Sequence, residues 1–149
     1  MRHRLISGLL SLVVGVFSVV TPAAVAGEGR IAVDDAYTAA KAGKLLIIDV
    51  RTPGEWRQTG IAEGAKTVDV NGAGGDAFFV AAVNDLVASD KGRPLAVICR
   101  SGNRSTRARG ILLANGFSSV LNIQEGMAGG AAGPGWLSRG LPVTPCPQC

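Results

Sequence analysis

Apolar and polar residues follow one another in blocks along the chain from residue 31 onward. Several apolar runs are short, uninterrupted and rich in β-branched residues, which is typical of strands covered on both faces of a sheet. Four segments are predicted strands, of which 45–50 and 95–98 are such runs: 45–50, 66–70, 95–98 and 120–123. Three intervening segments carry helix signals: 34–42, 76–88 and 105–114. Strands that alternate with helices predict an α/β fold with a mainly parallel sheet.

Local signals refine these boundaries. Ile31 is predicted to open a short edge strand, and Asp76 is expected to cap the second helix. That helix presents five apolar residues on one face: Phe79, Val80, Val83, Leu86 and Val87. The remaining segments are predicted to lack long elements: 51–56 forms a Pro-Gly turn, 71–76 a glycine-rich loop without a phosphate-binding fingerprint, and 136–138 a final helical turn.

The first 26 residues differ from the rest of the chain. A basic start is followed by the uncharged apolar run Leu5–Val20 and by an Ala-x-Ala site ending at Ala26. This layout predicts a secretory signal peptide cleaved after Ala26, hence a periplasmic or secreted protein without membrane association after cleavage. An uncleaved membrane anchor is the alternative.

Composition and charge narrow the function. The length of 149 residues predicts a single domain that is large enough to bury a hydrophobic core. Removal of residues 1–26 takes away Arg2 and Arg4, so the mature net charge falls from +4 to +2. The cations are scattered except for one cluster. Because they form no extended basic surface, a nucleic-acid partner is not expected. That cluster comprises Arg100, Arg104, Arg107 and Arg109.

Cys99 lies beside this arginine cluster, between a buried strand and a helix. Backbone N–H groups and the helix dipole converge at such a corner, so it binds anions and favours a thiolate. The only histidine, His3, lies in the predicted signal. This excludes Cys-His and Ser-His-Asp catalytic arrangements and the usual histidine-containing metal sites. No metal or cofactor is expected.

A second polar group follows the strand 45–50. Asp49 and Arg51 lie at its C-terminal end, the side on which open α/β sheets build their sites. Arg51 has either a functional role or a structural one, in an ion pair with Asp49 or Glu55 that holds the turn.

Several segments together resemble the single-domain type of the rhodanese family. They occur in the family's order over nearly all of residues 31–143: Leu46–Trp56 (LIIDVRTPGEW), Gly60–Ala65 (GIAEGA), Cys99–Ser105 (CRSGNRS), Gly116-Phe117, Trp136 and Gly140–Val143 (GLPV). The resemblance implies a three-layer fold, with a small, mainly parallel sheet flanked by helices. Together with the signal-peptide layout of residues 1–26, it predicts a rhodanese-like domain (27–143) and a C-terminal tail (144–149).

The resemblance also implies a chemistry. Cys99 would carry a persulfide, taking sulfur from a small anionic donor such as thiosulfate or a persulfide and passing it to cyanide or to a thiol, including a protein thiol. The family's sulfurtransferases have four residues between the cysteine and the arginine, whereas its phosphatases and arsenate reductases have five. Four separate Cys99 from Arg104 here. The loop residues expected to bind the donor are Arg100, Ser101, Gly102, Asn103, Arg104 and Ser105, with structural support from Asp49, Arg51 and Glu55.

Other features leave alternatives open. Residues 128–135 are a small-residue insertion relative to the family, on one wall of the predicted mouth. Cys146 and Cys149 form a local disulfide, a relay that resolves the Cys99 persulfide, or a metal site. A non-catalytic persulfide carrier for a secreted partner is the second hypothesis for the function, and a phosphatase or arsenate reductase the third. The sequence leaves the oligomeric state undetermined.

Overall fold

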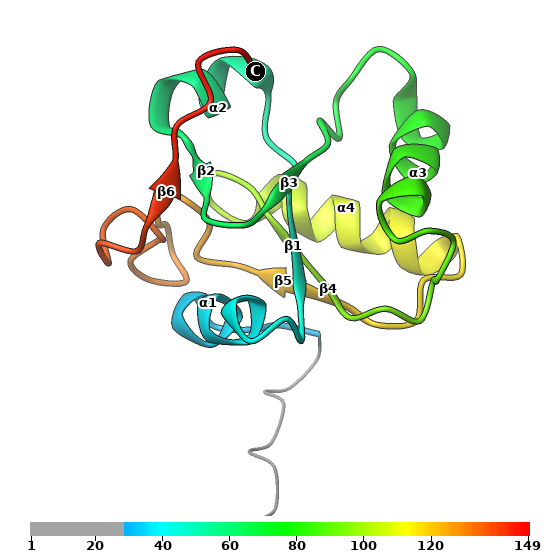
Figure 1. Ribbon diagram of the computed structural model, residues 1–149, viewed down its shortest axis with the longest axis horizontal. Coiled ribbons are helices and arrows are strands. Elements are labelled where there is room, and N and C mark those ends of the chain that lie inside the picture. Colours follow the sequence, from blue (N-terminus) through cyan, green and yellow to red (C-terminus); the bar gives the residue numbers. More distant parts are fainter. Residues whose placement is uncertain (1–28) are drawn as a thin grey trace, which may run out of the picture.

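A computed structural model describes residues 29–149, so the predicted signal peptide and its cleavage site lie outside the described residues. The chain forms a four-stranded sheet with helices on both faces and a separate two-stranded sheet (Figure 1). The elements in chain order are α1 (Val33–Lys41), β1 (Leu46–Asp49), α2 (Pro53–Thr59), β2 (Ile61–Ala62), β3 (Lys66–Thr67), α3 (Gly75–Leu86), β4 (Leu95–Ile98), α4 (Asn103–Ala114), β5 (Val120–Ile123) and β6 (Val143–Thr144).

The main sheet is parallel throughout, with strand order β3-β1-β4-β5. Its central strands β1 and β4 have apolar side chains on both faces because each face is covered by a separate core. On one face Ile48 and Val97 pack with residues of α3 and α4, including Phe79. On the other, Ile47 and Ala96 belong to the core that contains residues of α1 and the C-terminal segment. The predicted three-layer arrangement, a small parallel sheet flanked by helices, is therefore confirmed.

Several predicted boundaries are wrong. The Pro-Gly turn at 51–56 is the start of helix α2, which Thr52 caps in a reciprocal arrangement with Glu55. The strand predicted at 66–70 shortens to β3, and the edge strand at Ile31 is reduced to a single bridge between Arg30 and Asn122. Helix α4 begins at residue 103 instead of 105. The pairing of β2 with β6 was not predicted, because two-residue strands carry no periodic pattern.

Helix α3 also differs from its prediction. It spans 75–86, and its N-cap is Gly74, which has no side chain to cap the helix. Asp76 lies in the first turn and forms an ion pair with Arg107 of α4 instead of capping. The predicted apolar face is correct, since Phe79, Val83 and Val87 are buried. Residues 136–140 form turns in which the N–H of residue 139 donates to the carbonyl of residue 135, as in one helical turn.

A buried ion pair connects the main sheet to α2. The guanidinium of Arg51 donates to both carboxylate oxygens of Asp49 at 2.7–3.0 Å, and the two side chains are 2% and 0% exposed. Its remaining donors reach the hydroxyl of Thr59 and the carbonyl of Gly60, both at 2.7 Å. Arg51 therefore fixes the C-terminal end of α2 against the end of β1, and these contacts are structural.

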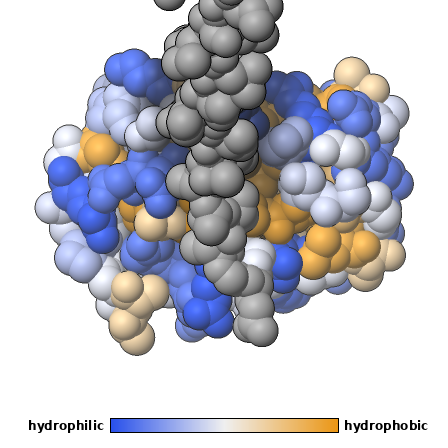
Figure 2. All heavy atoms as spheres, turned by 90° about the horizontal axis from the view of Figure 1, so that it is seen from below, coloured by the Kyte–Doolittle hydropathy of each residue, from blue (hydrophilic) through white to orange (hydrophobic). Residues whose placement is uncertain are grey.

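The opposite end of the sheet, where the strands begin, is hollowed. A groove of about 840 Å³ lies there between α1 and β5, with Leu45, Pro94 and Leu121 among its walls. Figure 2 looks onto this end of the molecule and shows hydrophobic residues near the middle of the face and toward its edges, interspersed with polar residues. Within residues 29–149, no helix is long and apolar enough to cross a membrane.

Replacement of Arg51 tests the buried pair. Arg51→Ala leaves the carboxylate of Asp49 buried without its counter-charge, so we expect a loss of about 3–5 kcal/mol in the free energy of unfolding. Urea denaturation followed by circular dichroism measures it. Arg57→Ala is the matched control on the exposed face of α2 and should cost about 0.5 kcal/mol or less. Equal costs for the two variants would contradict the structural role of Arg51.

Candidate functional site

Cys99 follows β4 directly and lies at the base of the loop that leads into α4. Its side chain is 1% exposed and its thiol is free. The Sγ accepts a hydrogen bond from the N–H of Gly102 at 3.1 Å. Gly102 has φ +96°, and a Cβ at this position would collide with the carbonyl oxygen of Gln124. Only glycine therefore allows this amide to point at the sulfur.

Ser105 supplies a second polar contact to the sulfur. Its Oγ lies 3.4 Å from the Sγ of Cys99 and 3.0 Å from the carbonyl oxygen of Gly102, and the residue is fully buried. A serine hydroxyl carries one hydrogen, so it donates to one of these two acceptors at a time. The surrounding hydrogen bonds decide which acceptor is available.

Thr106 occupies the competing acceptor, the Gly102 carbonyl, and Asn122 sets the direction of the Thr106 hydroxyl. The amide nitrogen of Asn122 donates to the Oγ1 of Thr106 at 2.9 Å, so the hydroxyl hydrogen of Thr106 is directed to the Gly102 carbonyl at 2.8 Å. The backbone N–H of Thr106 reaches the same carbonyl at 3.0 Å. Both lone pairs of that oxygen are thus engaged. The Ser105 hydrogen is left for Cys99 when the sulfur is an anion.

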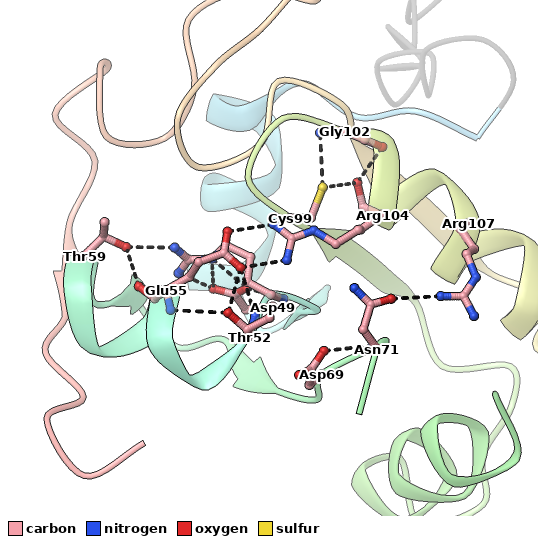
Figure 3. A network of polar contacts seen from close by, with 12 residues as sticks. Asp49, Thr52, Glu55, Thr59, Asp69, Asn71, Cys99, Gly102, Arg104 and Arg107 are labelled. Atoms are coloured by element: carbon pink, nitrogen blue, oxygen red, sulfur yellow. Dashed lines mark hydrogen bonds and ion pairs between the residues drawn. The ribbon is translucent and has the colours of Figure 1, made fainter. Parts of the chain in front are cut away.

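Arg104 is paired with Glu55 (Figure 3). The two guanidinium nitrogens of Arg104 donate to the two carboxylate oxygens of Glu55 at 2.6 and 2.7 Å. The hydrogen bond from Arg104, with the contacts from Thr52, lowers the pKa of Glu55 to about 2. The same bond from Glu55 is the largest cause that raises the pKa of Arg104, and the charge of Cys99 contributes less. The pair is therefore ionised throughout the range in which a thiol titrates.

Arg104, which was predicted to bind the donor, is thus paired with Glu55, and the charge of Cys99 adds to the rise in its pKa. The predicted support residue Glu55 thus acts on the loop, whereas Asp49 is the partner of Arg51. The direct contacts of the sulfur come from Gly102 and Ser105.

The other arginines of the cluster have separate positions. Arg100 is exposed, as are the loop residues Ser101 and Asn103. Arg107 contacts Asp76 and the loop that precedes α3, and so braces that loop against α4. Arg109 donates to the carbonyl of residue 120 at the start of β5. Arg100 is therefore the member of the cluster that faces solvent beside Cys99.

Residues 124–128 hold the loop from behind. The N–H of Met127 donates to the carbonyl of Cys99 at 2.8 Å, and the N–H of Ala128 to that of Arg100 at 2.9 Å. A Cβ on Gly126, which has φ +69°, would collide with the Arg100 carbonyl. The insertion continues as a tight hairpin closed by Gly130 and Gly133, and Gly130 lies against Ser101. The 128–135 insertion thus lies beside the loop.

The C-terminal tail lies beside α2 in Figure 1. Cys146 and Cys149 are joined in a disulfide, and the terminal carbonyl of Cys149 accepts a hydrogen bond from Arg57 of α2. Strand β6 precedes the disulfide and is anchored on β2. In residues 29–149, no group of three or more His, Cys, Asp or Glu side chains is placed to hold a metal ion.

The site and the sheet together define a class of protein: a small parallel α/β domain with a cysteine loop at the C-terminal ends of its strands. The Rhodanese-like domain family matches residues 32–132, and the chain belongs to this family. The fold, the loop and the order of the flanking motifs agree with that membership.

Individual relatives are distant. The protein RC0915 of Rickettsia conorii is 30% identical over 103 residues, which cover 65% of this chain and 80% of the relative. A protein of Allochromatium vinosum named sulfurtransferase is 28% identical over 99 residues, which cover 66% and 78%. Among solved structures, Rv0390 from M. tuberculosis superimposes with a TM-score of 0.58 at 26% identity, over 73% of this chain and 90% of Rv0390.

The hydrogen-bond chain through Thr106 predicts an effect on the reactivity of Cys99. Ser105→Ala removes a donor to the anionic sulfur, so we expect alkylation of Cys99 by iodoacetamide at neutral pH to slow by about tenfold, the equivalent of about 1.4 kcal/mol. Thr106→Val frees the Gly102 carbonyl to compete for the Ser105 hydrogen and should slow alkylation by less. The time course of Cys99 alkylation without reductant, the alkylation profile, measures both.

A matched control exists on α1. Thr38 donates to the carbonyl four residues earlier, as Thr106 does, but it is remote from the sulfur. Thr38→Val should leave the alkylation profile unchanged. The assigned direction of the Ser105 hydrogen is refuted if Ser105→Ala leaves the profile where it was.

Proposed function

We propose that this protein is a sulfurtransferase that carries a sulfane sulfur on Cys99. The observation that supports it best is the environment of the thiol: a buried sulfur receives an amide and a hydroxyl hydrogen bond at the start of a helix, and the described residues contain no histidine to act as a base. Such a site stabilises an anionic sulfur and needs no proton-transfer partner.

The first step is a displacement at sulfur. The Cys99 thiolate attacks the outer sulfur of thiosulfate, a new S–S bond forms, and the S–S bond within thiosulfate breaks. The bonding pair leaves with sulfite, and Cys99–S–S⁻ remains. No proton is transferred, which suits a site without histidine. The outer sulfur of another persulfide reacts in the same way, with a thiolate as the leaving group.

The persulfide anion requires hydrogen-bond donors. By their position in the first turn of α4, the N–H groups of residues 103–105 lack a carbonyl four residues earlier within the helix. They are available to the outer sulfur, and the positive end of the helix dipole adds to their effect. In the second step an acceptor thiolate or cyanide attacks that sulfur and regenerates the Cys99 thiolate.

The loop length and the relatives favour sulfur over phosphate as the transferred group. Four residues separate Cys99 from Arg104, which is the spacing of the family's sulfurtransferases. The A. vinosum relative bears the name sulfurtransferase. Exposed Arg100 beside the site would attract an anionic donor. Together with the predicted signal peptide, these features support sulfur transfer in the periplasm or outside the cell, with a small thiol or a protein thiol as acceptor.

Replacement of the thiol tests the proposal directly. Cys99→Ser should abolish thiosulfate-dependent formation of thiocyanate and should leave the protein folded by circular dichroism. Incubation with thiosulfate should add the mass of one sulfur to the Cys99 peptide of the unmodified protein. A serine variant that stays active would refute the mechanism. A stable adduct without turnover would instead indicate a carrier.

The tail disulfide provides a second arm of that experiment. In the double variant Cys146→Ser, Cys149→Ser, thiocyanate formation should persist if the pair is a local disulfide. Loss of activity in this variant, with the Cys99 adduct still formed, would identify the pair as a relay that resolves the persulfide.

The Arg104–Glu55 pair predicts a rescue. Arg104→Ala leaves the Glu55 carboxylate without its partner near an anionic sulfur, so thiosulfate turnover should fall by at least about tenfold, or about 1.4 kcal/mol. Arg107→Ala removes a more distant pair with Asp76 and should have a smaller effect. Addition of Glu55→Gln to Arg104→Ala should restore part of the turnover. Equal effects of Arg104→Ala and Arg107→Ala would contradict this geometry.

A further inference from the structure

The disulfide between Cys146 and Cys149 is a feature that the sulfur chemistry on Cys99 does not use. The bond joins residues three positions apart, so it encloses only Pro147 and Gln148. It connects no two of the helices and strands described in residues 29–149. A cross-link stabilises a fold mainly by restricting the unfolded chain, and this effect is smallest when the closed loop is short. A structural role therefore does not account for the two cysteines.

The pair is nevertheless held in place and is reachable from solvent. Strand β6, which ends at Thr144, is paired with β2, and Arg57 of α2 donates to the carbonyl of Cys149. The N–H of Cys149 donates to the carbonyl of Cys146 at 3.1 Å, which closes a turn without the help of the S–S bond. Both cysteines are partly exposed, and the two residues between them are exposed. The sulfurs are thus accessible to a thiol, and the contacts that hold them close together do not depend on the bond.

Helix α2 lies between the disulfide and the cysteine loop. Glu55 of α2 holds Arg104 of that loop, whereas Arg57 of the same helix contacts Cys149. Residues two positions apart in a helix do not face each other, so the disulfide lies on a different side of α2 from the loop. A thiol that reacts with the disulfide in this arrangement comes from solvent and not from Cys99, which is buried.

Arg57 places a positive charge beside Cys149. A neighbouring arginine stabilises a thiolate, and a sulfur that departs as a stabilised thiolate departs faster. In this pair the arginine takes the place of the helix N-terminus that activates other Cys-x-x-Cys pairs. We propose that Cys146 and Cys149 form a thiol–disulfide exchange site, separate from the sulfurtransferase site, that accepts electrons from an external dithiol.

The exchange consists of two displacements at sulfur. A thiolate of the external dithiol attacks the Sγ of Cys146, a bond forms between these two sulfurs, and the bond between Cys146 and Cys149 breaks. The bonding pair leaves on the Sγ of Cys149, beside Arg57. The second thiolate of the dithiol then attacks the dithiol's own sulfur in the mixed disulfide, so that Cys146 leaves as a thiolate. Two electrons pass from the dithiol to the protein, its two protons reach the new thiolates through solvent, and a second disulfide reverses the steps.

Reduction by dithiothreitol in native buffer at pH 7 tests the site. After a quench with iodoacetamide, tryptic digestion yields the peptide 140–149, whose mass counts the free tail cysteines apart from Cys99. The tail disulfide should be reduced at least about tenfold faster than glutathione disulfide under the same conditions, because its leaving thiolate is stabilised. Glutathione disulfide should then re-form the bond, and the circular dichroism spectrum should stay the same in both states.

Two arginine variants test the part of Arg57. Arg57→Gln should slow the reduction by about threefold. Arg93→Gln is the matched control, since it removes an exposed charge just before β4, and it should leave the rate unchanged. Equal rates for the two variants would overturn the assignment of Cys149 as the leaving sulfur.

The proposal as a whole is overturned if the tail disulfide reacts no faster than glutathione disulfide, because the bond would then be merely exposed. A circular dichroism spectrum that changes on reduction would also overturn it, because the bond would then be structural. The measurement uses no thiosulfate, and its outcome is the same whether or not Cys99 carries a persulfide.

Discussion

The buried pair of Asp49 and Arg51 is the contact on which the site depends. Both charges are removed from water, and such a pair is stabilising only when its remaining donors are also satisfied. Arg51 satisfies them with groups at the end of α2. Helix α2 is thereby fixed, and it carries Glu55, which holds Arg104 at the start of α4. One pair at the end of β1 therefore sets the position of a charge at the cysteine loop.

The electrostatics of the loop rest on hydrogen-bond direction more than on net charge. Four arginines in ten residues suggest a strongly positive pocket, but their contacts distribute them differently. Arg104 is neutralised by Glu55, Arg107 braces a neighbouring loop, and Arg109 is bound to a carbonyl. The sulfur instead receives a backbone N–H and a hydroxyl whose hydrogen is directed by Thr106. Dipoles fixed by the fold cost no reorganisation when charge develops on the sulfur.

The sequence predicted the long elements of the fold well, because continuous apolar runs report burial on both faces of a sheet. Residues 95–98 and 120–123 were placed correctly to the residue. The start of α2 was missed because Pro53-Gly54 was interpreted as a turn, although Thr52 and Glu55 have the spacing of a capping box, which signals a helix start. The two-residue strands β2 and β6 are too short for any periodic signal.

The candidate site was predicted in part. Cys99 and its loop follow from the strand-to-helix corner and from the family motifs. The pairing of Arg104 with Glu55 joins residues 49 positions apart, and no local pattern reports such a contact. The roles of Thr106 and Asn122 were also missed. They depend on the direction of the Thr106 hydroxyl hydrogen, which Asn122 turns toward the Gly102 carbonyl. That direction is a property of the assembled network and not of residue type.

The backing of the loop by residues 124–128 has a consequence for how new activities arise on this fold. Two carbonyls of the loop are bonded to Met127 and Ala128, and Gly102 is in close contact with Gln124. A loop lengthened by one residue would have to break this register or move the backing segment with it. The length of the cysteine loop and the position of residues 124–128 are thus coupled. A change of the transferred group that requires a longer loop would also require residues 124–128 to move.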